Sequence, residues 1–497
     1  MMDDACDYDV LIAGGGLVGA SLAVALQGSG LRVAVVEPVS PRDSRQPSFD
    51  DRHTALAPTS RRFFLNLGLW ESLAGGVEPI RRIHVSDRGH GGFTRLDAEE
   101  EGLPALGHVA PNRLLGAVLG PAMRQAADVF CPAEIRDTSV VLTEDGVAGD
   151  TPGAGADPSP RGAAGAAGAA GAGGDGSATA TGSATVTGTA TATGTATADT
   201  HSVARHVVIE TEDGTRTVST RLLVVADGMG SRTRDALGVG LDERDYGQSA
   251  IIANLRTRRP HQGTAYERFT PEGPLALLPV ANAMSLVWTL PHDEASAVAT
   301  EWSDRDFLAR LQDAFGWRLG RLEAVGERSV YPLRAVTAEC FATDRAVILG
   351  NAAHALHPVA GQGLNLALRD VAGLAEALGA APPRHQNDPA DGDTAGSNAS
   401  PAPGLEGDAA RESAPAPAIT DPGNPAILAA YARARQSDYR RTFVFTDGLV
   451  RVFSNEFLPL VAARNIGLTA LDLFPPARRQ LLKQATGAAG DVPILCQ

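Results

Sequence analysis

The sequence predicts an α/β protein in which a parallel sheet with flanking helices is interleaved with a mixed β-sheet and followed by C-terminal helices. Two glycine-rich segments, at residues 14–19 and 350–363, each follow an apolar strand-like run and precede a helical pattern. Between about residues 201 and 291 the pattern changes to short strands separated by Pro and Gly. The alternation of strand and helix at both ends indicates a nucleotide-binding architecture with a second sheet inserted into it.

The first glycine-rich segment stands between a predicted buried strand at residues 8–13 and a predicted helix at 17–26. Gly14 permits the tight turn, Gly16 lets the main chain approach a pyrophosphate, and Gly19 lets the helix pack closely on the strand. The helix start offers free N–H groups and a partial positive charge to phosphates. The segment therefore predicts a dinucleotide site, and a glycine-rich turn without a ligand is the alternative.

A second strand, predicted over residues 32–37, ends in Glu37, eighteen residues beyond Gly19. A carboxylate at this place binds a ribose 2′-hydroxyl in dinucleotide-binding folds, so Glu37 favours an unphosphorylated adenosine ribose, as in FAD or NAD. A second strand–glycine–helix unit is not visible in the sequence. We therefore expect no separate domain for a nicotinamide donor.

Composition excludes several other classes of protein. The chain of 497 residues has no apolar run long enough to cross a bilayer, and its first residues are acidic, which predicts a cytoplasmic protein. The four cysteines are scattered and predict neither a zinc site nor a disulfide framework. The net charge of -15 argues against nucleic acid as a partner.

Two low-complexity segments carry about half of that charge. Residues 150–200 are almost wholly Gly, Ala, Thr, Ser, Pro and Asp, and residues 381–424 are rich in Pro, Ala, Asp and Gly. Neither segment can bury enough apolar surface to offset its ordering entropy, so both are predicted to be disordered surface insertions. A fibrous or adhesive repeat is the alternative for the first segment, but its period is irregular.

The remaining strands and helices are predicted from the periodic spacing of their apolar residues. In chain order they are a hairpin at 201–220, a buried strand at 222–226, several strands between 249 and 291, a parallel strand at 345–349, a helix at 363–378 and a helical segment at 425–482. The helical segment has apolar residues at helical spacing with arginines nearby, and we expect it to pack on the nucleotide-binding domain.

Three motifs together resemble the FAD-dependent aromatic monooxygenases of the p-hydroxybenzoate hydroxylase fold. They are Gly14-x-Gly16-x-x-Gly19, Asp227-Gly228-x-x-Ser231-x-x-Arg234, and Gly350 to His354 followed by Pro358 and Gly361-Gln362-Gly363. Within that family, residues 357–366 and Arg369-Asp370 are similar to the ubiquinone-biosynthesis branch, above all to 2-polyprenyl-6-methoxyphenol hydroxylases. Residues 84–90, 267–270, 315–320 and 464–468 strengthen this resemblance, which covers nearly everything except the two insertions.

The resemblance implies a Rossmann-like FAD-binding domain with an interleaved mixed β-sheet substrate domain and a C-terminal helical segment. The implied parts are a discontinuous FAD-binding domain at residues 1–80, 108–149, 201–240 and 340–380, a substrate domain at 81–107 and 241–339, the insertions at 150–200 and 381–424, and a C-terminal helical region at 425–497.

The resemblance also implies which residues contact FAD. Glu37 would meet the adenosine ribose, and Arg52 would lie beside the pyrophosphate or the ribityl chain. Asp227 would lie near the pyrophosphate and the nicotinamide side of the cleft, or cap the turn before the helix at Ser231, and the two roles are compatible. The full implied set is Gly14, Gly16, Gly19, Glu37, Arg52, Asp227, Gly350, Asn351, Pro358, Gly361, Gln362, Gly363, Leu364 and Asn365.

The second loop is expected to border the isoalloxazine ring. Pro358 and the backbone of 361–364 would aim amides at the polar edge of the ring, where they oppose the negative charge of reduced flavin. The family has Asp where this chain has Asn351, whose amide can still bond ribityl hydroxyls but supplies no charge. His354 and His357 are weak candidates for acid–base catalysis, and structural hydrogen bonding is the favoured interpretation of both.

The implied chemistry is reduction of FAD, reaction with O2 to a C4a-hydroperoxyflavin, and transfer of one oxygen to a polyprenylated methoxyphenol ring in ubiquinone biosynthesis. NAD(P)H or a protein electron donor would supply the electrons. Contact with the inner face of the cytoplasmic membrane or with a multienzyme complex is a further hypothesis. The alternatives are a flavin monooxygenase on a soluble aromatic metabolite and a non-catalytic FAD-binding scaffold. A flavin halogenase is disfavoured, because it needs an active-site lysine and the only lysine is Lys483.

Overall fold

The computed structural model of the protein describes residues 6–40, 52–143, 202–380, 421–453 and 457–497. The predicted insertions at 150–200 and 381–424 lie outside these residues, apart from 421–424. There Asp421 accepts hydrogen bonds from the Arg345 guanidinium at 3.0 and 2.6 Å, so residues 421–424 belong to the C-terminal region. The predicted domain boundaries stay predictions.

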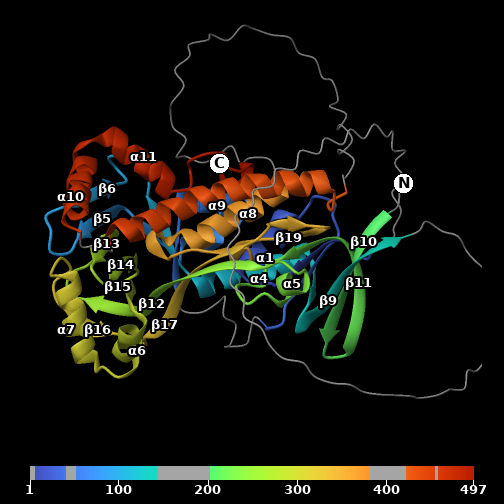
Figure 1. Ribbon diagram of the computed structural model, residues 1–497, viewed down its shortest axis with the longest axis horizontal. Coiled ribbons are helices and arrows are strands. Elements are labelled where there is room, and N and C mark those ends of the chain that lie inside the picture. The colour runs from blue at the N-terminus through green and yellow to red at the C-terminus, as the bar shows by residue number, and fades with distance from the viewer. Residues whose placement is uncertain (1–5, 41–51, 144–201, 381–420, 454–456) are drawn as a thin grey trace, which may run out of the picture. The chain divides into compact units, whose positions relative to one another are not determined.

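The first sheet has a parallel centre between helices (Figure 1). Its path runs β18-β19-β11-β1-β2-β8, and β10 and β9 continue it beside β11. The strands are β1 (Tyr8–Ala13), β2 (Val33–Val36), β8 (Asp128–Phe130), β9 (Ala133–Thr143), β10 (Ser202–Thr211), β11 (Gly214–Val225), β18 (Ala342–Thr343) and β19 (Ala346–Ile348). Alternate residues of β1 face opposite sides: Val10 and Ile12 pack with α1 (Leu17–Ala25), α4 (Asn112–Ala126) and α8 (Gln362–Ala377), whereas Leu11 packs on the other face. Burial of both faces explains the continuous apolar runs of these strands.

The second sheet is mixed. Its path runs β20-β17-β12-β15-β14-β13-β5-β6, with β16 beside β12, and the β13–β5 pair is parallel. The strands are β5 (Arg82–Asp87), β6 (Phe93–Asp97), β12 (Leu241–Thr257), β13 (Thr264–Thr270), β14 (Gly273–Val280), β15 (Ala283–Pro291), β16 (Leu322–Val325), β17 (Ser329–Ala338) and β20 (His354–Ala355). Trp288 and its neighbours on one face pack against α6 (His292–Thr300) and α7 (Asp304–Phe315). A smaller sheet joins β3 (His53–Leu56), β7 (Gly107–Pro111) and β4 (Glu78–Ile80).

These elements confirm the predicted α/β class. The strands predicted at 8–13, 32–37 and 345–349 and the helices predicted at 17–26 and 363–378 agree with the structure within two residues. One difference is that the strands predicted at 216–220 and 222–226 form the single strand β11. Its first half pairs with β10 and its second half with β1 and β19, so one strand serves two sets of neighbours.

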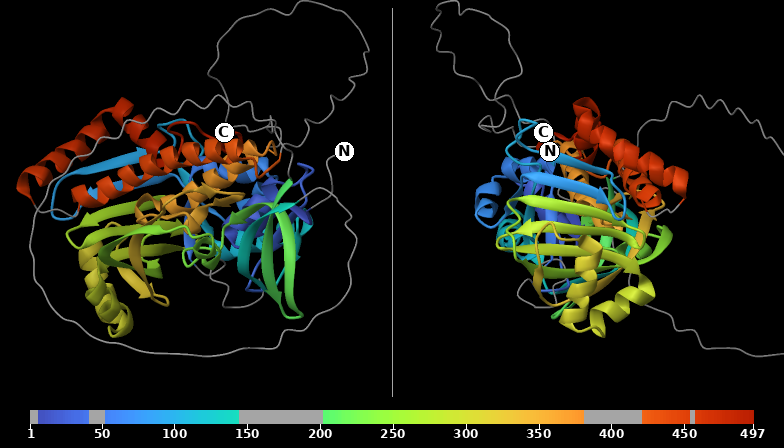
Figure 2. Two further views of the ribbon diagram at one scale, coloured as in Figure 1. Left: turned by 45° about the vertical axis from the view of Figure 1, so that its right-hand side comes forward. Right: turned by 90° about the vertical axis from the view of Figure 1, so that its left-hand side faces the viewer.

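The C-terminal helical segment divides into α9 (Pro425–Phe453), α10 (Leu458–Leu473) and α11 (Pro475–Ala485). Proline at the first positions of α11 fits a helix start and disfavours continuation of α10. Helix α9 runs along α8 in Figures 1 and 2, and its Leu428 and Tyr431 enter the core around the parallel sheet. The chain then returns through the 3₁₀ turn η3 (Ile494–Cys496), which packs on α8 and on α2 (Pro58–Asn66). In the described ranges no helix is long and apolar enough to span a membrane.

A buried ion network joins the second glycine-rich loop to α8 and α9. Asp370 of α8 accepts from Arg435 Nε at 2.7 Å and bonds His354 Nε2 at 2.5 Å. Arg435 also donates to Asp438 at 2.5 Å, and Arg369 donates to Asp438 at 2.8 Å. Burial disfavours the ionised form of Asp370, but His354 and Arg435 outweigh it and lower its pKa to about 2. The network thus holds charged partners together in the core.

The substitution Asp370→Asn tests this network. It leaves the Arg435 charge buried without its carboxylate partner, so we expect the free energy of unfolding to fall by about 3–5 kcal/mol. Chemical denaturation at neutral pH measures it, with Asp491→Asn as the control, because Asp491 is exposed and its substitution should change stability by less than about 0.5 kcal/mol. Equal stabilities of the two variants would contradict the assigned role.

Candidate functional site

The first glycine-rich loop lies at the carboxyl ends of β1 and β11. Gly14 has φ +96°, and a Cβ there would stand 2.6 Å from the carbonyl oxygen of Ala226. A Cβ on Gly19 would stand 1.8 Å from the carbonyl oxygen of Gly14. Both contacts need glycine, and they confirm the predicted tight turn and the close packing of helix on strand.

The start of α1 has the features of an anion site. Gly16 is the N-cap residue without a side-chain cap, and the first turn holds no acidic residue. The first helical hydrogen bond runs from Ala20 N–H to the Gly16 carbonyl, so the preceding amides have no partner within the helix. These amides and the helix dipole suit a pyrophosphate.

Glu37 lies directly beside this loop. Its buried carboxylate accepts from the Gly15 N–H at 2.6 Å and from the Val39 N–H at 2.9 Å, and the remaining space around Gly15 is small, since a Cβ there would stand 3.1 Å from Glu37 Cβ. The backbone thus holds the carboxylate at the end of β2, where the sequence predicts a ribose contact.

Asp227 and Arg52 have different neighbours in the structure. Asp227 follows β11 next to Gly14, and its Oδ2 accepts weakly from Thr233 N–H at 3.4 Å. Its buried Oδ1 has no partner among the described residues. Ser231 is the N-cap of α5 (Arg232–Ala236) and accepts from the Arg234 N–H, so Asp227 adds its weak contact to the first turn of the same helix. Arg52 lies before β3, with its guanidinium 5.0 Å from the centre of the Tyr331 ring.

The second loop contacts both the first glycine-rich segment and β3. Gly350 has φ +61°, and a Cβ there would stand 3.1 Å from a methyl of Val18 in α1. Gly361 has φ +62°, and a Cβ there would stand 3.2 Å from Cβ of Ala55 in β3. The structure therefore brings the segments at 14–19, 52–56 and 350–361 together, as the sequence predicts for one binding site.

The predicted residues of the second loop and of the start of α8 form two groups. The first group lies in turns, at the surface or partly against the core. Gly363 faces open space where a Cβ would meet nothing within 4 Å, and Asn351 is exposed on the turn after Gly350. Pro358 begins the 3₁₀ turn before α8, and Leu364 packs partly against the core.

The side chains of Gln362 and Asn365 point into the protein instead. Gln362 donates to the Ala485 carbonyl at 2.7 Å. The Asn365 amide accepts from Ala57 N–H and Ser60 Oγ, and it donates to the carbonyls of Ala55 and Gly361. All its hydrogen-bonding capacity is used to join α8 to β3 and α2, so Asn365 shapes the loop.

Both predicted histidines are buried within the protein. His354 is buried, is bonded to Asp370 and stacks on Tyr439 with ring centroids 5.5 Å apart. His357 is buried and accepts from Val359 N–H at 3.3 Å through Nδ1, which places its proton on Nε2. Burial lowers the pKa of His357 to about 4, so it stays neutral. These contacts support the structural interpretation of both residues.

The residues present fit FAD. Uncapped amides stand at the starts of α1 and α8, glycines line the positions where backbone must come close, and Asp227 Oδ1 is a buried acceptor without a donor among the described residues. A hydroxyl of a bound cofactor is the kind of donor that this acceptor lacks.

Sequence reasoning missed Glu267 as a candidate site residue. Alternation along β13 puts Glu267 on the same face as Ala265 and Phe269. Ala265 packs in an apolar cluster that reaches Ala55, and Phe269 stacks on Phe453 with ring centroids 3.8 Å apart. The carboxyl has no partner in the described ranges, and burial alone raises its pKa to about 7.

The position of Glu267 makes it a candidate for binding a polar group of a substrate. Ala265 on the same face packs in the cluster that Ala55 of β3 joins, and Ala55 lies beside Gly361 of the second loop. Glu267 is half-buried, so a carboxyl without a partner among the described residues stands beside apolar side chains and within reach of a ligand. The sequence shows Glu267 as one more polar residue in an alternating strand, so only the missing partner distinguishes it.

Comparison with known proteins supports an FAD site. A family model described as "FAD binding domain" matches residues 176–402. The chain is 33% identical to the ubiquinone hydroxylase UbiL of Rhodospirillum rubrum, with 96% of this chain and 89% of that protein covered. It is 25% identical to the 3-demethoxyubiquinol 3-hydroxylase of Escherichia coli (96% and 98% covered) and to the human mitochondrial ubiquinone biosynthesis monooxygenase COQ6 (96% and 92% covered).

Solved structures show the same fold. The p-nitrophenol 4-monooxygenase PnpA of Pseudomonas putida superposes with a TM-score of 0.64 at 14% identity, covering 96% of this chain and 98% of that one. At this identity the similarity concerns the fold alone.

The substitution Gly19→Ala tests the first loop. Because the added Cβ would stand 1.8 Å from the Gly14 carbonyl oxygen, the loop must open, and we expect FAD affinity to fall by at least about tenfold. Flavin fluorescence titration of the apoprotein measures it. Gly448→Ala in α9 is the control, since its Cβ would meet open space and should leave FAD affinity unchanged. An unchanged affinity in Gly19→Ala would remove the loop from the site.

The raised pKa of Glu267 predicts a pH-dependent stability. The folded protein keeps this proton up to about pH 7, whereas the unfolded chain loses it near the ordinary value of 4.5, so the stability cost grows between these values and is complete above pH 7. Removal of the charge in Glu267→Gln should raise the free energy of unfolding by about 1–3 kcal/mol at pH 8 and by much less at pH 5. Denaturation at both pH values measures this, with Glu301→Gln, at an exposed helix end, as the control. The same gain at both pH values would argue against an unpaired carboxyl.

Proposed function

Because this chain belongs to the family of FAD-dependent ubiquinone hydroxylases, we propose that it transfers one oxygen atom of O2 to the ring of a polyprenylated methoxyphenol in ubiquinone biosynthesis. The observation that carries the proposal is that the second glycine-rich loop contacts the first, through Gly350 on Val18, and β3, through Gly361 on Ala55, beside an uncapped helix start. The names of the relatives supply the substrate class.

We assign FAD to these loops. The amides at the start of α1 hold the pyrophosphate, Glu37 takes a ribose hydroxyl, and Asp227 accepts from a hydroxyl of the cofactor. The helix start of α8, with Gly363 facing open space, lies at the flavin ring. Bound FAD supplies the electron transfer and the oxygen activation, and NAD(P)H or a protein donor supplies the electrons.

We assign the phenolic hydroxyl of the substrate to Glu267. A carboxyl with a pKa of about 7 can accept a hydrogen bond from a phenol or take its proton near neutral pH, which makes the ring more electron-rich. Ala265 and Phe269 on either side give the ring and its prenyl substituent an apolar surface. The apolar surroundings also keep water from the reacting atoms.

A substrate with a polyprenyl tail resides in a bilayer, so the protein is proposed to work in the cytoplasm at the inner face of the membrane, alone or within a quinone-synthesis assembly. Exposed large apolar side chains on α9, on α10 and at the turns that flank α10 support contact with such a surface. A monooxygenase for a soluble aromatic metabolite is the second candidate.

Product analysis tests the function. Purified protein with FAD, a chemical or enzymatic reductant, heavy-isotope O2 and a short-tailed 2-polyprenyl-6-methoxyphenol should yield the ring-hydroxylated product with one heavy oxygen. Glu267→Gln should keep FAD and lose at least about tenfold in hydroxylation rate. Glu301→Gln is the matched control. Hydroxylation of simple soluble phenols in preference to the prenylated ring favours the second candidate, and retained FAD without product from either favours a non-catalytic scaffold.

A further inference from the structure

Helix α10 has the reverse polarity of an ordinary surface helix: its charged side chains face the protein, and its apolar side chains face outward. Its polar side chains face the protein: Arg464 donates to Asp87 of β5 at 2.8 Å, with both side chains buried. Asn465 also donates to Asp87, and its Oδ1 accepts from the Gly92 N–H at 2.7 Å. Asp472 accepts from the backbone N–H of Arg95 in β6 at 2.9 Å. The charges of α10 are thus used to attach it to the β5–β6 hairpin.

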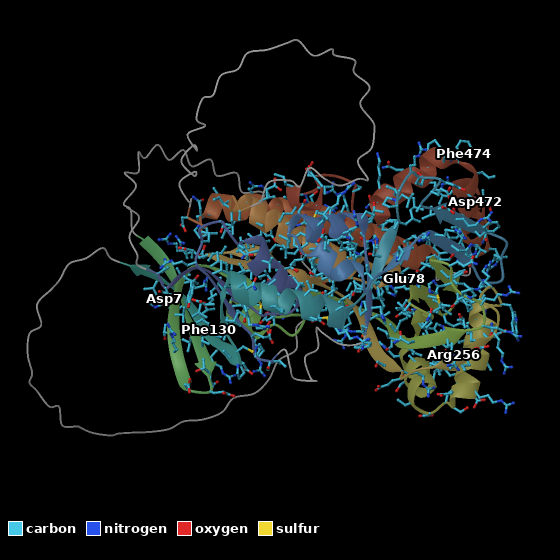
Figure 3. The ribbon with its side chains drawn as sticks, turned by 180° about the vertical axis from the view of Figure 1, so that it is seen from behind. Asp7, Glu78, Phe130, Arg256, Asp472 and Phe474 are labelled. Atoms are coloured by element: carbon cyan, nitrogen blue, oxygen red, sulfur yellow. The ribbon has the colours of Figure 1, made fainter. Side chains whose placement is uncertain are left out.

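The outward side of α10 is apolar. We call the exposed residues between 457 and 477 the docking face; they are Phe457, Leu458, Pro459, Ala462, Ala463, Ile466, Gly467, Thr469, Ala470, Leu473, Phe474, Pro475, Pro476 and Ala477. Leu458, Ile466 and Leu473 are 78%, 70% and 72% exposed. The charged residues in this range are Arg464 and Asp472, and both bind the hairpin. Phe474 lies next to Asp472 at the end of the helix (Figure 3).

Such a face needs a partner. Single exposed apolar residues are common, but a stripe that repeats along a helix of 16 residues, about 24 Å long, marks an interaction surface. A helix that is solvated on its outside carries the opposite pattern, with charged residues outward.

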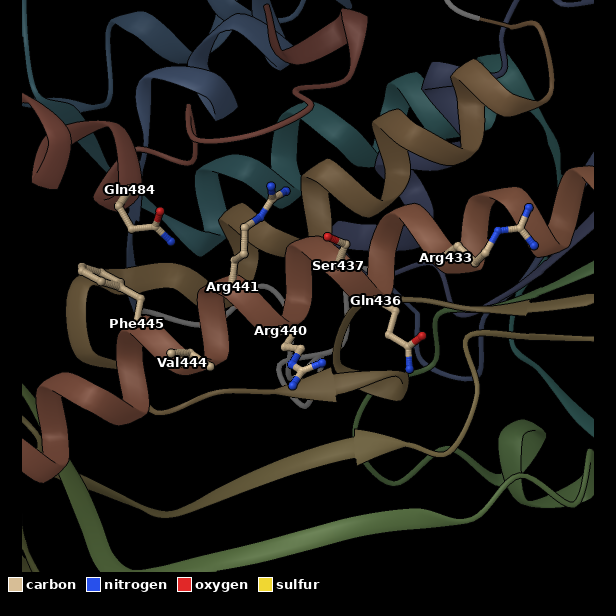
Figure 4. A pocket seen from close by; sticks show the side chains of 8 residues that line it. All are labelled: Arg433, Gln436, Ser437, Arg440, Arg441, Val444, Phe445 and Gln484. Atoms are coloured by element: carbon tan, nitrogen blue, oxygen red, sulfur yellow. The ribbon is translucent and has the colours of Figure 1, made fainter.

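The residues around the docking face favour an anionic lipid surface. Exposed Arg451 precedes it at the end of α9 and pairs with Asp447 at 2.6 Å; exposed Arg479, which pairs with Glu101 at 3.1 Å, and exposed Lys483 follow it in α11. A hollow of about 760 Å³ beside α11 adds basic groups on α9: it is lined by Arg433, Gln436, Ser437, Arg440, Arg441, Val444, Phe445 and Gln484 (Figure 4). An apolar helix face with basic residues at its borders is typical of helices that lie in the plane of a membrane interface.

The inner side of the same helices reaches the proposed substrate face. Leu468 of α10 packs with Phe269 and Phe453, and Leu482 of α11 packs in the cluster that holds Ala265. These clusters flank Glu267 on β13. Helices α10 and α11 therefore stand between the docking face and the proposed site of the phenol ring.

We propose that the docking face of α10 lies in the interface of an anionic phospholipid bilayer, where α10 and α11 receive the polyprenyl tail of the substrate. This inference rests on the proposed function for the identity of the tail. The basic groups on α9 and α11 face the lipid phosphates, and the apolar stripe enters the boundary between headgroups and acyl chains.

Vesicle flotation of the full chain tests the docking face. The wild-type protein should float with phosphatidylcholine vesicles that contain phosphatidylglycerol, and less with phosphatidylcholine alone. Ile466→Asp should lower the partition coefficient by at least about tenfold, because it removes an exposed apolar side chain that enters the lipid interface and adds a charge. Trp317→Asp is the matched control, since Trp317 is 68% exposed and lies outside α10, and it should float like the wild type.

Two outcomes would overturn the proposal: a wild-type protein that stays unbound to anionic vesicles, or an Ile466→Asp variant that floats equally well. A wild-type dimer that Ile466→Asp makes monomeric, without flotation of the wild type, would instead assign the face to a second copy. Hydroxylation of a short-tailed substrate in detergent should be equal in both variants. Hydroxylation without flotation counts against the docking face alone, and flotation without hydroxylation counts against the proposed function alone.

Discussion

The carboxylate of Asp370 is the constraint on which the flavin-side architecture depends. It is buried in α8 and it holds His354 from the second glycine-rich loop and Arg435 from α9. Its backbone neighbour Arg369 extends the contact to Asp438. A buried charge without a partner destabilises the folded state, so each charged residue of this network requires the others. The second glycine-rich loop, α8 and α9 must therefore come together in one arrangement. The geometry of the glycine-rich loops therefore depends on Arg435, which lies 65 residues beyond Asp370 in the sequence.

Within this frame, close backbone contacts define the candidate site. Gly14, Gly19, Gly350 and Gly361 each stand where a Cβ would meet another segment or where φ is positive. The site lies at the carboxyl ends of parallel strands, which is the usual position for ligands in such sheets. The side chains proposed to contact cofactor and substrate are Glu37, at the end of β2, and Glu267, on β13 of the second sheet.

Much of this could be predicted from the sequence, because strands buried on both faces and helices with an apolar stripe leave distinct periodicities. The glycine spacing predicted the turn after β1, and the structure agrees. Side-chain partners could not be predicted in the same way. Asn365 and His354 occur in a loop motif that suggests ligand contact, yet their hydrogen bonds go to Ala55, Ala57 and Asp370. Glu267 and the outward face of α10 depend on which neighbours are present in three dimensions, and periodicity does not say which side of a helix is inside.

The return of the chain through η3 has a mechanical consequence. The segment leaves α8 along α9, forms the outer helices and comes back to α8, where Leu495 and Cys496 enter the same core as Leu368. The outer helices α10 and α11 are therefore held at both ends by contacts with α8, through α9 before them and through η3 after them. Removal of either anchor, α9 or η3, would therefore leave the outer helices attached to α8 at one end only.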